Sequence, residues 1–226
     1  MNDISVKNEI LERIRKGKPA PAPLPDVPEY PWPGDPTEKF IAQLIVFDGR
    51  AIKFKTRDDA VSWFKSQPEA DSSRMKIYSS VADIAGNVGA EDAKDPEKIA
   101  QINTCVTEAG LGVGETGSVW VTDKSLGVAA CALLSRRIFA LLDAKKIKGG
   151  LCEAYNSIRL GDSQYGSFFS GPSATADIEA VRITGAQGHL ALTAMIYNCE
   201  DASEPPELIV SPNADVSPWV KEEEKE

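Results

Sequence analysis

Residues 104–122, TCVTEAGLGVGETGSVWVT, join two strand-like runs through a glycine-rich loop. The runs at 104–106 and 118–122 are rich in β-branched and aromatic residues, which favour strands. Between them, Gly110 to Gly117 contains four glycines in eight residues, and glycine lets a backbone turn sharply or approach a ligand closely. On both sides, short strand-like runs alternate with helical spacings of apolar residues. This alternation predicts an α/β domain with a mostly parallel sheet flanked by helices and one antiparallel portion.

Two periodicities place the other elements. Apolar residues three and four positions apart predict helices over residues 37–48, 58–66 and 144–156. Short apolar or alternating runs predict strands over residues 51–55, 76–79, 138–142 and 190–197. A further helix is expected to start at Gly171-Pro172-Ser173.

The chain divides into four segments. Residues 1–16 have the spacing of an amphipathic helix, and residues 17–36 hold eight of the 15 prolines. This proline-rich linker is expected to run as extended polyproline II, either as a tether or as a strap over the domain; a ligand for a proline-recognition module is the alternative. The α/β domain is expected over residues 37–212, followed by a solvated acidic tail at 213–226.

Composition excludes several classes of partner. The chain has 226 residues, 42% of them hydrophobic, and a formal net charge of −9. Binding to nucleic acid or to an anionic membrane surface needs a clustered positive excess, so neither is expected. No apolar run approaches the roughly 20 residues of a membrane span. The first residues lack the basic and apolar regions of a secretory signal, so a cytoplasmic location is expected.

Cysteine and histidine usage argues against a resident metal. The four cysteines are Cys105, Cys131, Cys152 and Cys199, and no two are spaced as a CxxC pair. We therefore expect buried reduced thiols and no iron–sulfur or zinc cofactor in this chain. His189 is the only histidine, which excludes a site with several histidine ligands.

The turn Gly114-Glu115-Thr116-Gly117 is the first candidate site. Glu115 lies among apolar neighbours, and partial burial would raise the pKa of its carboxyl and suit it to act as general base or nucleophile. Gly114, Thr116 and Gly117 are candidate ligand-binding residues beside it. The alternative is a plain hairpin turn with a solvated glutamate.

Residues 171–179, GPSATADIE, are the second candidate site. At a helix start, Gly171, Ser173 and Thr175 would offer backbone N–H groups and hydroxyls to a small anion. Asp177 and Glu179 would repel that anion unless Arg182 supplies a positive charge; an ordinary helix cap is the alternative. In parallel sheets ligands bind beside the carboxyl ends of strands, and we expect both candidate loops there.

A later glycine loop, residues 185–189, completes the set of candidates. Gln187 is a candidate ligand-binding residue, and His189 could orient the same polar ligand. A histidine in a surface loop without a role is the alternative for His189. Arg136 and Arg137 are either binders of a carboxylate substrate or solvated side chains.

These motifs resemble those of a known family. Gly114-Glu115-Thr116-Gly117 resembles an Ala-Glu-Thr-Gly signature, and residues 171–179 are similar to a Gly-Pro-Ser-x-Thr-Ala-Asp-Ile-Glu signature, of the LUD-domain lactate-utilization proteins. In size the chain is most similar to their C component, and the resemblance covers roughly Thr37 to Cys199. It implies a NagB/RpiA/CoA-transferase-like α/β fold. It also implies a part in oxidising L-lactate to pyruvate beside partner subunits that carry the iron–sulfur clusters.

Two positions depart from the family's pattern. Ala174 stands where the family usually has arginine, and Gln187-Gly188-His189 stands where it usually reads His-Gly-Pro. If those family residues hold a shared ligand, this chain binds a different ligand or none.

Three functions are therefore open. The first is a subunit without a cluster in a lactate-oxidising iron–sulfur system. The second is a stand-alone enzyme that uses Glu115 on an acyl-CoA, phosphate or carboxylate ligand. The third is a divergent assembly or regulatory module that docks through its N-terminal helix and proline-rich linker.

Overall fold

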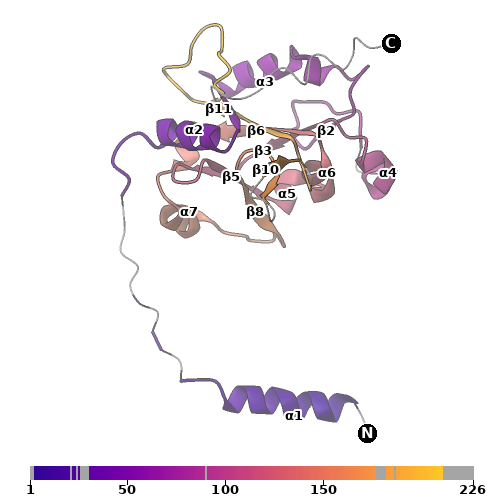
Figure 1. Ribbon diagram of the computed structural model, residues 1–226, viewed down its shortest axis with the longest axis vertical. Coiled ribbons are helices and arrows are strands. Elements are labelled where there is room, and N and C mark those ends of the chain that lie inside the picture. The colour runs from indigo at the N-terminus through magenta and orange to yellow at the C-terminus, as the bar shows by residue number, and fades with distance from the viewer. Residues whose placement is uncertain are drawn as a thin grey trace.

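A five-stranded parallel sheet forms the centre of the domain. The computed structural model describes residues 3–20, 22–23, 25, 31–89, 91–176, 182–185 and 187–210, so the predicted acidic tail lies outside the described residues. The strand order is β1-β11-β6-β3-β2, and every pairing is parallel (Figure 1). The strands are β1 (Arg50–Lys53), β2 (Ile77–Ser79), β3 (Thr104–Glu108), β6 (Arg137–Asp143) and β11 (Ala191–Tyr197). The predicted α/β fold with a mostly parallel sheet is confirmed.

Strand β11 shows why the sheet is central. All seven of its residues are buried, and it pairs with β1 on one side and β6 on the other. A strand that is covered on both faces carries a continuous apolar run instead of an alternating one. Elements must therefore pack on both faces of the sheet.

A second sheet covers one face and supplies the expected antiparallel portion. Its order is β7-β4-β5-β8, and β5 pairs antiparallel with both neighbours. Val119, Val121 and Phe169 of this sheet share one buried core with Leu142 and Leu192 of the first. The strands are β4 (Leu111–Val113), β5 (Ser118–Thr122), β7 (Ile147–Lys148) and β8 (Gly166–Phe169).

Helices α2 (Pro36–Val46) and α3 (Arg57–Lys65) lie on opposite faces of the central sheet. In α2, Phe40 and Leu44 are fully buried in the core shared by the two sheets. In α3, a capping box between Thr56 and Asp59 fixes the first turn, and Phe64 packs edge-on against Phe139 of β6. Each helix begins one residue before its predicted start.

The remaining elements are short. The helices are α4 (Pro96–Ile99), α5 (Asp123–Leu126), α6 (Ala129–Leu134) and α7 (Leu151–Ser157). The 3-10 turns are η1 (Pro68–Ala70), η2 (Asp92–Lys94) and η3 (Ala144–Lys146). The helix predicted over residues 144–156 is wrong. Gly149 and Gly150 interrupt it, so that η3, β7 and α7 replace one continuous helix.

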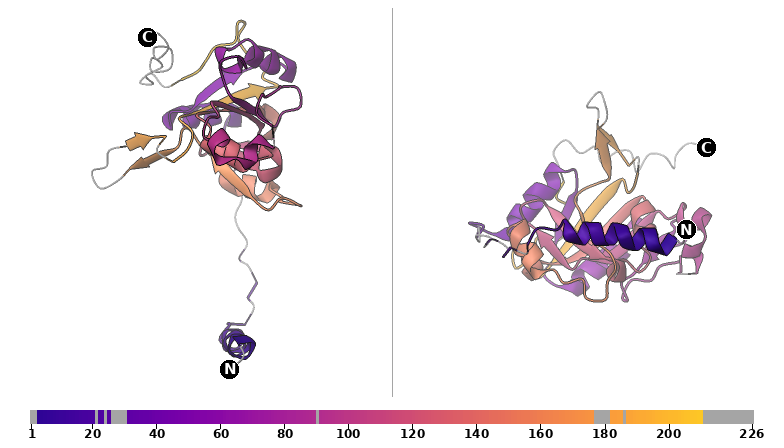
Figure 2. Two further views of the ribbon diagram at one scale, coloured as in Figure 1. Left: turned by 90° about the vertical axis from the view of Figure 1, so that its right-hand side faces the viewer. Right: turned by 90° about the horizontal axis from the view of Figure 1, so that it is seen from below.

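The helix predicted to start at Gly171-Pro172-Ser173 is also wrong. Residues Ala174–Ala176 form strand β9, which pairs antiparallel with β10 (Arg182–Thr184) in a hairpin that projects from the domain (Figure 2). Ser173 N–H donates to the carbonyl of His189 over 2.8 Å, and the carbonyl of Ser173 accepts from Gly185 N–H over 2.6 Å. These backbone bonds continue the hairpin and leave no helix start there.

The predicted N-terminal helix is confirmed as α1 (Asp3–Lys16). The side chains of residues 5–16 are all exposed, and Figures 1 and 2 show α1 apart from the domain. At the other end of the proline-rich linker, Trp32 lies against Gly149 and under the Lys39 ammonium, which is 4.7 Å from the ring centroid. No described helix is both long enough and apolar enough to cross a membrane.

Removal of residues 1–20 is expected to change the free energy of unfolding of the domain by less than about 0.5 kcal/mol, because exposed side chains contribute little. Trp32→Ala in the full chain is expected to destabilise by about 1 kcal/mol, since it uncovers Gly149. Thermal and urea unfolding measure both. A large fall in stability on truncation would show that α1 packs on the domain.

Candidate functional site

The first motif forms the turn between β4 and β5. Residues 114–117 connect Val113 to Ser118, which face each other in the hairpin. Glu115 is exposed, and its Oε2 accepts a hydrogen bond of 2.8 Å from the backbone N–H of Leu151, the first residue of α7. A carboxylate there stabilises the helix start. The partial burial expected for Glu115 is not found.

The two glycines of this motif are required because neighbouring backbone leaves no room for a side chain. Gly117 has a φ of +58°, and a Cβ there would collide with the α2 backbone at Gln43 and Leu44. A Cβ on Gly114 would lie 3.2 Å from the carbonyl oxygens of Pro36 and Gly149. Both positions are buried, and both let the hairpin backbone approach α2 more closely than any side chain would allow.

Ser170 brings the two motifs together. Its hydroxyl donates to the carbonyl of Thr116 over 2.9 Å and lies 3.3 Å from the carbonyl oxygen of Gly117. The Thr116 hydroxyl is itself bonded to the Ser118 hydroxyl over 2.5 Å. A Cβ on Gly171, at φ +62°, would collide with the carbonyl of Phe47 at the end of α2. Both motifs therefore pack against α2 or the residue that ends it.

The second motif lies at the amino ends of the parallel strands. Ser173 is bonded to His189, which just precedes β11, and Leu190 N–H donates to the carbonyl of Arg136, which just precedes β6. The expectation that this loop lies at the carboxyl ends is wrong. Thr175 is exposed on β9 and Gln187 is exposed beside His189, whereas Asp177 and Glu179 lie outside the described residues.

His189 is a buried histidine and not a surface residue. Only 6% of it is exposed, its Nε2 lies 3.0 Å from the carbonyl oxygen of Gly171, and its ring centroid is 5.7 Å from that of Phe169. Its Nδ1 is buried and has no hydrogen-bond partner among the described residues. Burial lowers the pKa of His189, so the ring is neutral at pH 7 with the proton on Nε2, donated to Gly171.

Two arginines begin strands at the same edge of the sheet. Arg50 starts β1 and Arg137 starts β6, and both are partly buried. Burial lowers the pKa of both guanidinium groups, and the charge of Glu69 partly offsets this. Both guanidinium groups therefore lie within electrostatic reach of the Glu69 carboxylate.

A hollow of about 400 Å³ lies at the opposite, carboxyl edge of the sheet. Its lining residues follow three different strands: Lys55 after β1, Lys145 after β6, and Asn198, Cys199 and Glu200 after β11. The chain leaves β1 for α3 on one face and leaves β6 for β7 on the other. Such a divergence is where open α/β sheets bind ligands. Sequence reasoning missed this site, although Lys55 is the last residue of a predicted strand and the other lining residues follow predicted strands.

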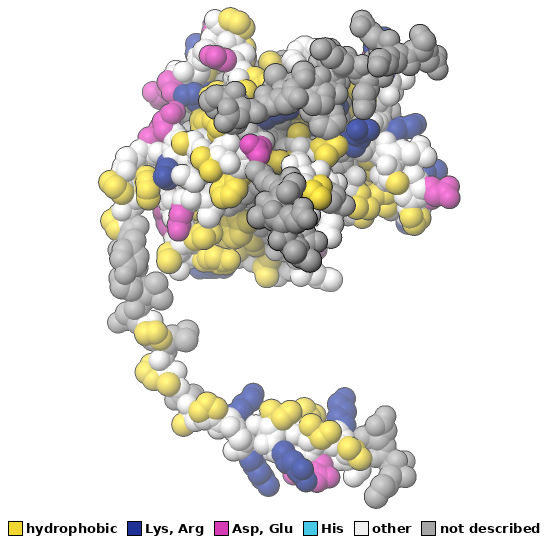
Figure 3. All heavy atoms as spheres, in the orientation of Figure 1, with side chains coloured by type: hydrophobic (Ala, Val, Ile, Leu, Met, Phe, Trp, Pro, Cys, Tyr) yellow, Lys and Arg dark blue, Asp and Glu magenta, His cyan; other side chains and the backbone are white. Residues whose placement is uncertain are grey.

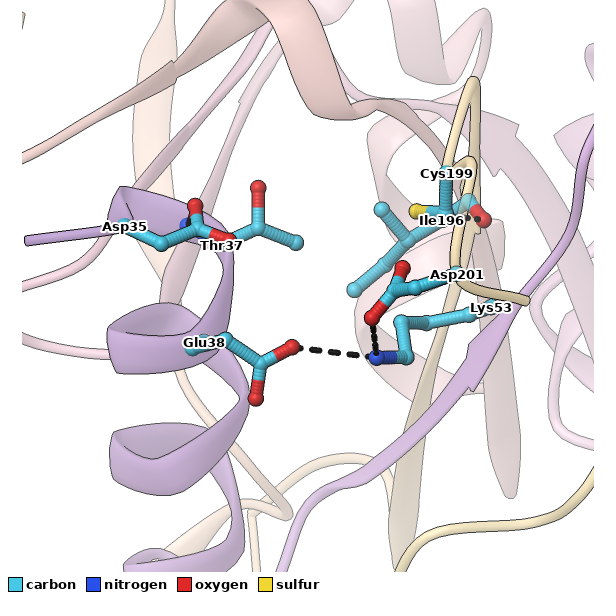
Figure 4. Close-up of polar contacts among 7 residues, drawn as sticks. All are labelled: Asp35, Thr37, Glu38, Lys53, Ile196, Cys199 and Asp201. Atoms are coloured by element: carbon cyan, nitrogen blue, oxygen red, sulfur yellow. Dashed lines mark hydrogen bonds and ion pairs between the residues drawn. The ribbon is translucent and has the colours of Figure 1, made fainter. Parts of the chain in front are cut away.

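Beside this hollow, Lys53 holds three segments together (Figure 4). Its Nζ donates to Glu38 of α2 over 3.0 Å and to Asp201 over 2.5 Å, and only 17% of its side chain is exposed. Burial works to lower the pKa of Lys53, but the bonds to Asp201 and Glu38 outweigh it and raise the pKa. The ammonium therefore stays charged and ties α2 to β1 and to the segment after β11.

Cys199 lines the hollow with an unreactive thiol. Burial, helped by the negative charge of Asp201, raises its pKa to about 11, and its Sγ donates to the carbonyl of Ile196 over 3.6 Å. A thiol is a poor nucleophile until it ionises. Among the described residues, no three histidine, cysteine or acidic side chains gather as a metal-binding group.

Comparison with known proteins gives one family and one fold. The LUD domain model matches residues 35–197 of this chain. The structure is similar to the crystal structure of a DUF162 family protein from Deinococcus radiodurans, with a TM-score of 0.52 and 14% identity, over 72% of this chain and 96% of that chain. At this identity the likeness shows a shared fold. No curated protein matches the sequence significantly.

Gly117→Ala and Gly161→Ala separate packing from backbone strain. Both glycines have a positive φ, +58° and +57°, but nothing lies within 4 Å of a Cβ at Gly161. The strain common to both is about 1–2 kcal/mol. Gly117→Ala is expected to cost about 1–3 kcal/mol more, because its methyl group overlaps α2. Urea unfolding measures both losses; equal losses would contradict the packing role.

His189→Gln is expected to flatten the pH dependence of stability near neutrality. The pKa of His189 is lowered in the folded protein. At a pH between the folded and unfolded pKa values, the unfolded chain therefore binds a proton on His189 that the folded chain does not bind. Stability therefore falls as the pH drops from about 6.5 toward the folded pKa. Glutamine keeps an N–H for Gly171 but does not titrate. Urea unfolding between about pH 7.5 and 5.5 measures this; identical profiles for both proteins would contradict it.

Proposed function

Because the chain belongs to the LUD-domain family, we propose that it is a subunit of a cytoplasmic iron–sulfur system that oxidises L-lactate to pyruvate. In this proposal it resembles the C component and carries no cluster itself. Oxidation of L-lactate to pyruvate releases two electrons and two protons, so an electron acceptor is required. The partner subunits supply it with their clusters.

The protonation state of the thiols supports the proposal that the partner subunits, and not this chain, carry the clusters. Cys105, Cys131 and Cys199 are buried, and burial raises the pKa of each thiol. An iron–sulfur cluster is held by thiolates that converge on it. Cys152 is exposed on α7, apart from the buried core that contains the other three. Protonated thiols in a packed core are poor cluster ligands, which favours clusters in the partners.

Helix α1 supplies a surface for those partners. Val6, Ile10 and Ile14 recur every four residues and are 49%, 53% and 53% exposed. Figure 3 shows hydrophobic side chains along α1, away from the domain. Such a row gains stability when a partner buries it. The proline-rich linker gives the helix the reach to do so.

The alternative enzyme that uses Glu115 has less support. Its carboxylate is exposed and holds the start of α7. A general base or nucleophile is usually shielded from water or activated by a neighbouring group. The geometry therefore favours the subunit over the stand-alone enzyme.

A tagged pull-down from the native host grown on L-lactate tests the proposal. We expect a brown eluate that contains additional subunits and has the broad visible absorption of iron–sulfur clusters. Growth on another carbon source provides the comparison. A colourless eluate that contains this chain alone would contradict the proposed function.

A variant with Val6, Ile10 and Ile14 replaced by serine tests the role of α1. It is expected to lose the coloured partners while the unfolding midpoint of the domain stays unchanged. Lys7→Ser with Glu12→Ser changes two further exposed positions of α1 and serves as the matched control. Retention of the partners by the serine variant would place the contact elsewhere on the chain.

A further inference from the structure

The hollow at the carboxyl edge has the size and position of a small-molecule site. Its volume of about 400 Å³ lies within the usual range of ligand sites, about 300–1,000 Å³. Segments after β1, β6 and β11 line it, at the point where the chain turns to opposite faces of the sheet. Strand ends that are fixed by a buried sheet give such residues a rigid base.

The two basic side chains that line the hollow, Lys55 and Lys145, follow different strands. Lys55 forms an ion pair with Glu204. Lys145 is exposed in η3, and within the described part of the chain no carboxylate lies at ion-pair distance from it. Asp143 accepts the backbone N–H of Lys145 over 3.0 Å and the Asn198 side-chain amide over 2.8 Å. Asp143 therefore fixes the two segments that carry Lys145 and Asn198.

The acidic groups limit the charge of any ligand. Glu200 lines the hollow, and Glu204 and Asp201 lie on the same segment after β11. A dianion such as phosphate would be repelled by these carboxylates. A monoanion that also carries a hydroxyl fits better, because its carboxylate pairs with an ammonium while its O–H donates to Glu200 or to the amide oxygen of Asn198.

We infer that this hollow binds a small hydroxycarboxylate, with the ligand carboxylate held by Lys145 and Lys55 and its hydroxyl held by Glu200 or Asn198. The site rests on the geometry above. The choice of L-lactate as the first probe rests on the proposed function.

Calorimetric titration of the full-length protein with L-lactate, propionate, L-alanine and inorganic phosphate tests this inference. We expect saturable binding of L-lactate, and weaker binding of propionate, which lacks the hydroxyl. Lys145→Met is expected to weaken L-lactate binding at least about tenfold, as for the loss of a charge-assisted hydrogen bond. Lys146→Met is the matched control, because Lys146 is an exposed neighbour in η3 that does not line the hollow.

Each other outcome overturns a stated part of the inference. Absence of saturable binding for every probe overturns the site. Equal weakening by Lys145→Met and Lys146→Met overturns its location, and tighter binding of phosphate or L-alanine overturns the ligand class. The pull-down is independent of these results, since a Lys145→Met protein that keeps its partners supports the proposed function even where the titration fails. Loss of the partners from the wild-type protein counts against the proposed function and leaves the site standing.

Discussion

Helix α2 packs against glycine-containing backbone segments, which approach it more closely than residues with side chains could. Most of the structure depends on this fit. Phe40 and Leu44 of α2 are fully buried in the core shared by both sheets. Glycines meet the helix at several points, of which Gly117 and Gly171 are the closest. Lys53 then holds the first turn of α2 to the carboxyl end of β1 through Glu38. The two sheets are joined through this helix as well as through direct contact.

This fit changes how the two family motifs are understood. Glycines in a short turn suggest close approach to a ligand, but here the backbone approaches α2. Glu115 lies at the start of α7, and Ser170 ties the two motif loops to one another. His189 is a neutral hydrogen-bond donor to the carbonyl of Gly171 in the second motif. The motifs that identify the family are therefore also the residues that hold its second sheet in place.

The second motif and the proposed binding site occupy opposite edges of the same sheet. Ser173 and His189 lie at the amino ends of the strands, near the partly buried Arg50 and Arg137. The hollow lined by Lys55 and Lys145 lies at the carboxyl ends. The proposed ligand site and the exposed apolar row of α1 are therefore separate parts of the molecule.

The sequence by itself determined the elements that local chemistry controls. The apolar runs at 104–106, 138–142 and 190–197 predict strands, the helical spacing over residues 58–66 predicts α3, and the two motifs identify the family. The local sequence led to a wrong prediction at Gly171-Pro172-Ser173, which has the composition of a helix start. In the structure, the Ser173 backbone forms hydrogen bonds with the backbones of His189 and Gly185. Only the tertiary structure decided where Glu115 lies, that His189 is buried, and that Lys55, Lys145 and Asn198 share one hollow. The physical reason is that burial and charge proximity depend on residues far apart in the sequence, which the packing of both sheets brings together and a local pattern does not encode.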